Sequence, residues 1–160
     1  MCGETVSSSV FESSEKVDYG YVINRQLDRV AEARSSVFKA TKWDVSSSVS
    51  YSRLLDYLSA LEALHALLLP ELKDDVREIL SSVKYLAYKY SKCREEKDCE
   101  RLVAEEIGEL ANKYGLQYKM LSFYVLFDLC DKALEIMMTN LNRAGLLMRG
   151  KIVKLGTARG

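Results

Sequence analysis

A heptad repeat near the C-terminus constrains the fold of this chain more than any other feature. Between residues 120 and 148, apolar side chains recur in alternating steps of three and four, which places them along one stripe of an α-helix. The stripe consists of Met120, Phe123, Phe127, Cys130, Leu134, Met137, Leu141, Ala144 and Met148. A second apolar set flanks its first half and consists of Leu121, Tyr124, Val125, Leu126, Leu129, Ala133 and Ile136. A helix that is apolar on two sides needs neighbours on both, so we expect a long central helix from Leu116 to about Met148.

The second half of this helix should be buried along one stripe only. Asp131, Lys132 and Glu135 restore a polar face there, so these side chains are expected to face solvent.

Four further helices are expected before the heptad repeat, because apolar residues again recur at helical spacing. They run from about Val17 to Thr41, Tyr51 to Leu69, Pro70 to Ser91 and Asp98 to Tyr114. Pro70 either breaks the chain or begins the third of these helices, and Gly115 is suited to cap the fourth. Short connections favour antiparallel neighbours. The sequence therefore predicts an all-α fold, an up-and-down bundle of about five helices around a long central C-terminal helix.

The domain organisation follows from composition along the chain. Residues 1–16 are rich in serine and glutamate and carry few large apolar side chains, so we expect a flexible N-terminal arm. Residues 17–150 should form a single helical-bundle domain, because a chain of 160 residues is long enough for one sizeable core. Residues 151–160 form a basic C-terminal tail.

Composition also bears on location and redox state. The formal net charge is zero, and neither a signal peptide nor a long apolar run is evident, so we expect a cytoplasmic protein without membrane contact. Scarce Asn and Gln are typical of thermophile proteins, and intracellular proteins of hyperthermophiles are an exception to the rule that cytoplasmic thiols stay reduced. Cys93 and Cys99, separated by five residues, are therefore either free thiols or a disulfide across one loop.

Glu62 and His65 form an E-x-x-H pair, the spacing with which helical bundles bind iron or manganese. Such sites need a second pair, and this chain has a single histidine. His65 also falls on an apolar stripe, which favours a hydrogen-bonded core or boundary histidine. We expect no metal site and no cofactor.

The chain also lacks the motifs of the common nucleotide-binding and hydrolytic enzymes. It contains neither a G-x-S-x-G nucleophile turn nor a glycine-rich phosphate loop of the G-x-x-x-x-G-K-[ST] or G-x-G-x-x-G type. We therefore expect a protein that is not an enzyme and has no catalytic residues.

Basic residues gather at the C-terminus and in the first helix. From residue 143 onward the chain carries positive charges and no acid, namely Arg143, Arg149, Lys151, Lys154 and Arg159. Helix-end electrostatics alone would explain Arg143 and Arg149. The first expected helix adds Arg25 and Arg29, with Arg34, Lys39 and Lys42 further along. Such clusters can neutralise nucleic-acid phosphates without reading sequence, although basic helical faces are often only solvated.

Tyr85, Tyr88 and Tyr90 are interleaved with lysines and could stack on bases or form the rim of a core. The sequence as a whole predicts a non-enzymatic helical binding protein, an accessory subunit or factor of a nucleoprotein assembly. The alternative is a homo-oligomeric structural or adaptor protein that acts through protein–protein contacts, with its heptad stripe, or part of it, paired between chains.

Overall fold

The computed structural model describes residues 2–42, 48–73, 76–93, 96–116 and 122–147, with only the backbone described for residues 2–17 and 48. Within these ranges all regular structure is helical, which confirms the all-α fold. The elements are α1 (Cys2–Thr41), α2 (Ser48–Leu67), the short 3-10 helix η1 (Pro70–Leu72), α3 (Arg77–Lys92), α4 (Lys97–Lys113) and α5 (Ser122–Arg143). None of these helices is both long enough and apolar enough to cross a membrane.

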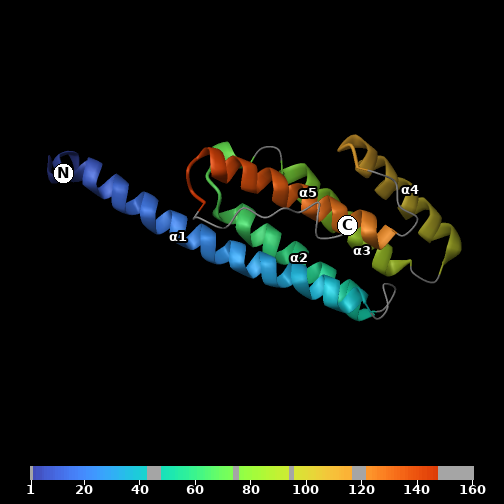
Figure 1. The fold of residues 1–160 in the computed structure, drawn as a ribbon. Coiled ribbons are helices and arrows are strands. Elements are labelled where there is room, and N and C mark those ends of the chain that lie inside the picture. The colour runs from blue at the N-terminus through green and yellow to red at the C-terminus, as the bar shows by residue number, and fades with distance from the viewer. Residues whose placement is uncertain (1, 43–47, 74–75, 94–95, 117–121, 148–160) are drawn as a thin grey trace.

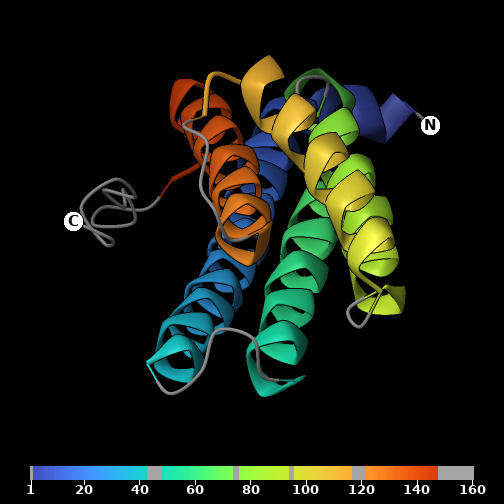
Figure 2. The ribbon, with the colours of Figure 1, turned by 90° about the vertical axis from the view of Figure 1, so that its right-hand side faces the viewer.

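The helices pack as an up-and-down bundle. The first two form a long antiparallel hairpin, and α5 lies against α2, α3 and α4 (Figure 1). Seen from the side, α3 and α4 run side by side in opposite directions at the edge of the bundle (Figure 2). Thus α5 is the helix that the others share as a neighbour.

The first helix begins at Cys2 rather than near Val17, so the segment expected as an arm is the first part of α1. Its backbone extends beyond the rest of the bundle (Figure 1). Between Gly3 and Gly20 the chain has neither proline nor glycine, and serine and glutamate cost an exposed helix only tenths of a kcal/mol each. Nothing in that stretch therefore stops the helix.

The C-terminal helix is shorter than its heptad pattern predicts. It spans 22 residues, whereas α1 spans 40, so the expected long central C-terminal helix is wrong in length. It ends at Arg143 because Gly145 adopts a φ of 69°. The N–H groups of Gly145 and Leu146 then donate to the carbonyl oxygens of Asn142 and Leu141, each at 3.0 Å, which closes the helix.

The same closure ends α4, as the sequence predicts. Gly115 has a φ of 70°, and Leu116 N–H donates to the Ala111 carbonyl at 2.9 Å. Pro70 begins η1, and the helix expected to follow it directly starts only at Arg77.

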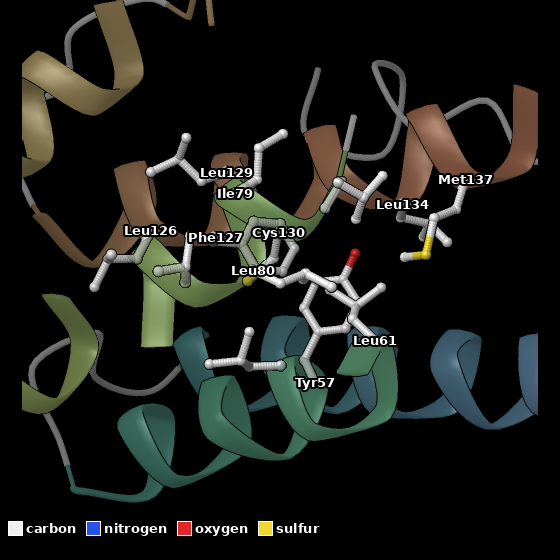
Figure 3. Close-up of a cluster of buried hydrophobic side chains, with 14 of the residues drawn as sticks. Tyr57, Leu61, Ile79, Leu80, Leu126, Phe127, Leu129, Cys130, Leu134 and Met137 are labelled. Carbon is white, nitrogen blue, oxygen red and sulfur yellow. The ribbon is translucent and has the colours of Figure 1, made fainter. Parts of the chain in front are cut away.

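The heptad stripe is buried by other helices of the same chain. Its described members between residues 123 and 141 are at most 3% exposed and pack against α2 and α3 (Figure 3). Met120 and Met148 lie outside the described residues. Pairing of this stripe between chains is therefore wrong for the part of α5 that the structure describes.

Candidate functional site

A buried ion pair joins α1 to α5. Arg34 donates from Nε and Nη2 to the two carboxylate oxygens of Asp131, both at 2.8 Å. Tyr57 of α2 donates its hydroxyl to Asp131 Oδ1 at 2.6 Å. The Arg34 guanidinium also lies 4.9 Å from the Phe38 ring centroid and 5.4 Å from that of Phe127. Three helices thus converge on one carboxylate.

This cluster corrects two expectations. Asp131 is 5% exposed, so it does not belong to the solvated polar face predicted for its helix. Arg34 is 8% exposed, so it does not belong to the basic surface predicted for the first helix. Val30, Arg34 and Val37 are spaced by four and three residues, which places Arg34 on the buried face of α1. That spacing was the available signal, because an arginine on an apolar stripe needs a buried anion.

The buried environment shifts the ionisation of the cluster. Burial, followed by the charge of Asp131, raises the pKa of Tyr57 well above its ordinary value. Burial lowers the pKa of Arg34, but hydrogen bonding and charge from Asp131 outweigh it and raise that pKa overall. The cluster is therefore a stable ion pair with a neutral tyrosine, and it pins the helices together rather than facing a ligand.

A groove between α1 and α2 is the better candidate for binding. It has a volume of about 320 Å³ and is lined by Tyr21, Val22, Arg25, Gln26 and Arg29 of α1 and by Ala63 and Leu67 of α2. No carboxylate is among these lining side chains, so the described groove is positively charged.

The shape of this groove is held by local contacts. Gln26 donates to the Ala60 carbonyl at 3.0 Å and so ties the two helices together beneath it. Tyr21 is 54% exposed, and the Arg25 guanidinium carbon lies 5.8 Å from the centroid of its ring. The groove therefore offers an aromatic ring, apolar methyl groups and cationic side chains in one place.

The structure brings together some of the predicted basic residues. Arg25 and Arg29 line the groove, and Arg143 is exposed in the last turn of α5. The other predicted contacts, Arg149, Lys151, Lys154 and Arg159, lie outside the described residues. Asn24 donates to the carbonyl oxygens of Gly20 at 2.6 Å and of Leu146 at 2.8 Å, which joins the end of the described chain to α1 beside Arg25.

Glu62 and His65, the pair considered as metal ligands, make contacts with other residues of the chain. Lys84 Nζ lies 3.3 Å from Glu62 Oε2, and His65 Nε2 lies 3.3 Å from the Lys73 carbonyl oxygen. Within the described ranges, no three His, Cys, Asp or Glu side chains come together as metal ligands would.

Three described cysteines, Cys93, Cys99 and Cys130, are thiols. Burial, then the neighbouring Cys99, raises the pKa of Cys93 to about 11, so it is protonated at neutral pH. Burial likewise raises the pKa of Cys130. Of the two alternatives for Cys93 and Cys99, the structure shows free thiols, and a disulfide between them stays an untested prediction.

The aromatic and lysine residues of α3 divide into two groups. Tyr90 packs on the core, with its ring centroid 6.2 Å from that of Tyr51. Tyr85 and Tyr88 are 57% and 61% exposed, and the ammonium groups of Lys89 and Lys92 lie 4.7 and 5.3 Å from their ring centroids. These two tyrosines belong to a second surface, on the opposite helices of the bundle.

Comparisons with known protein families, curated proteins and solved structures give no match to this chain. The features of this chain that bear on its function are its own fold and surfaces, an all-helical bundle with an arginine-lined groove on its first hairpin.

Proposed function

We propose that this chain is a non-enzymatic binding protein, an accessory subunit or factor of a nucleoprotein assembly, that contacts nucleic-acid phosphates without reading sequence. The observation that carries the proposal is the α1–α2 groove, where Arg25 and Arg29 stand beside an exposed Tyr21 and no lining carboxylate opposes them.

The chemistry of the groove suits a phosphate backbone with a base attached. A guanidinium group presents paired N–H donors that match phosphate oxygens. An exposed tyrosine ring can stack on any base, which adds affinity without sequence preference. Arg143, exposed in the last turn of α5, would add a further phosphate contact, and the basic residues of the tail would add to the electrostatic attraction.

The surrounding charge limits the affinity. Asp28 and Glu32 are exposed on α1, each three residues beyond one of the groove arginines. They weaken the local positive field, so we expect binding in the micromolar range or weaker at physiological salt, on the order of 10⁻⁴ to 10⁻⁶ M.

The test is fluorescence anisotropy with a labelled single-stranded oligonucleotide at low salt. Replacing Arg25 and Arg29 together by glutamine should weaken binding roughly tenfold or more, because two phosphate contacts are lost. Tyr21→Ala should weaken it without changing the net charge.

The matched control replaces Arg53 of α2 and Arg101 of α4 by glutamine, because both are exposed arginines outside the groove lining and the net charge changes equally. Equal losses in the two double variants would mean that only total charge matters. Absence of binding by the unaltered chain would reject the proposal outright.

The alternative, a homo-oligomeric structural or adaptor protein, is favoured by a different observation. Tyr85, Tyr88 and Leu102 are large apolar side chains exposed on the α3–α4 side of the bundle. That surface does not depend on the groove between α1 and α2.

A further inference from the structure

A second and larger groove runs between α3 and α4 on the outer edge of the bundle. Its volume is about 750 Å³, and its lining includes Tyr88 and Lys92 of α3 and Leu102, Val103 and Glu105 of α4. Tyr88 is 61% exposed and Leu102 is 56% exposed, so these two side chains form an apolar strip that faces outward. Exposed aromatic and leucine side chains gathered in one groove mark an interaction surface.

The two walls of this groove carry opposite charge. On the α3 wall, Lys92 is exposed at the end of the helix. On the α4 wall, Glu105 and Glu109 are exposed, and no described residue forms an ion pair with either. The pair formed by Lys89 Nζ and Glu106 Oε1, at 3.2 Å, bridges the two walls within the chain. Among the residues that line the groove, the outward-facing charges that form no ion pair within the chain are therefore Lys92 on one side of the apolar strip and Glu105 and Glu109 on the other.

A face with this pattern is complementary to itself. A two-fold axis along the groove lays the Lys92 side of one copy over the Glu105 side of another, and the same contact forms twice. Because α3 and α4 run in opposite directions, this placement also sets α3 of one copy antiparallel to α4 of the other (Figure 2). Four antiparallel helices with an apolar centre are a common way to bury such a strip.

We infer that a second copy of this chain occupies the α3–α4 groove and that the protein forms a two-fold dimer. Lys92 of each copy faces Glu105 of the other, and Leu102 and Tyr88 fill the centre. This inference does not rest on the proposed function, because the groove proposed to bind nucleic acid lies between α1 and α2 and shares no residue with the α3–α4 groove.

The experiment measures the molar mass of the full chain in solution by light scattering and sedimentation, at high micromolar concentration. The expected mass is twice the 18.2 kDa of one chain. Leu102→Asp should give monomers, whereas Leu55→Asp, which alters an exposed leucine of α2, should leave the dimer intact.

Charge exchange tests the arrangement of the two copies. Lys92→Glu alone and Glu105→Lys alone should each raise the dissociation constant roughly tenfold or more, because like charges then meet twice. The double variant K92E/E105K restores opposite charges across the interface and should recover the dimer. These surface variants decide the question even if Leu102→Asp loses its helical circular dichroism.

A mass of 18.2 kDa for the unaltered chain would overturn the inference. A dimer that survives Leu102→Asp with its helices intact would overturn it as well. Failure of the double variant to recover the dimer would reject this two-fold arrangement.

Discussion

The Asp131 carboxylate holds together helices that are distant in sequence. It accepts hydrogen bonds from Arg34, 97 residues away, and from Tyr57, 74 residues away. A buried charge with these hydrogen bonds is stable as a pair but costly when one member is removed.

Asp131→Ala should therefore lower the free energy of unfolding by about 3–5 kcal/mol, because it leaves the Arg34 charge buried without its anion. Glu135→Ala, one turn further along α5 and exposed, should change it by no more than about 0.5 kcal/mol. Urea unfolding followed by circular dichroism measures both. Similar values for the two variants would contradict the structural role of Asp131.

Tyr57→Phe removes one donor to Asp131 and should cost about 1–3 kcal/mol at neutral pH. The pKa of Tyr57 is raised in the folded chain, so the native state keeps its proton while the unfolded state ionises near 10.0. The contribution of the Tyr57 hydroxyl to the free energy of unfolding is thus complete below pH 10 and is lost as the pH rises above 10.

The stability difference between the unaltered chain and Tyr57→Phe should narrow above pH 10. Unfolding by urea at neutral and alkaline pH measures this change. A difference that stays constant would mean that the hydroxyl is not shielded in the folded protein.

At the scale of single residues, the sequence predicts well which side chains are buried but poorly which of them form ion pairs with each other. The apolar stripe of α5 is buried where described, as its spacing predicts. The Arg34–Asp131 contact joins residues with no regular spacing between them, so periodicity along one helix could not reveal it. Only the position of Arg34 between Val30 and Val37 hinted that it needed a buried anion.

Helix ends are decided by individual residues rather than by the period of the apolar side chains. The heptad pattern continues to Met148, yet α5 stops at Arg143 because Gly145 turns the backbone into the left-handed region. The pattern of the first helix begins near Val17, yet α1 begins at Cys2 because nothing in the polar stretch breaks it. Periodicity therefore identifies helices but not their limits.

Gly108 inside α4 and Gly115 just beyond its end test how single residues set the limits of a helix. A Cβ atom added at Gly108 or Gly115 would meet no atom within 4 Å, so only the backbone conformation decides the outcome. Gly108→Ala should stabilise the helix by about 0.5–1 kcal/mol. Gly115→Ala should destabilise it by about 1 kcal/mol, because the φ of 70° is strained for alanine.

Thermal unfolding of the two alanine variants measures these opposite changes in stability as a raised and a lowered melting temperature. Shifts of the same sign would show that Gly115 does not cap α4 in the left-handed conformation.

For the whole molecule, the structure confirms the all-α bundle. The sequence could predict it because amphipathic helices with short connections have few ways to pack. The candidate site was predictable only in part. Arg25 and Arg29 were identified by charge, but the groove also contains Tyr21 and Leu67, which come together only when α1 packs on α2. The charged walls of the α3–α4 groove depend on tertiary packing in the same way.

We propose that the arginines of the first hairpin hold nucleic-acid phosphates. The dependence of single-strand affinity on salt concentration tests it most directly, because each phosphate contact adds about 0.7 to the slope of log K against log salt. Replacing Arg25 and Arg29 by glutamine should reduce that slope by about 1.4, and a chain ending at Gly150 should reduce it further. If binding is absent, is independent of salt or keeps its slope without the two arginines, the first hairpin does not hold nucleic-acid phosphates.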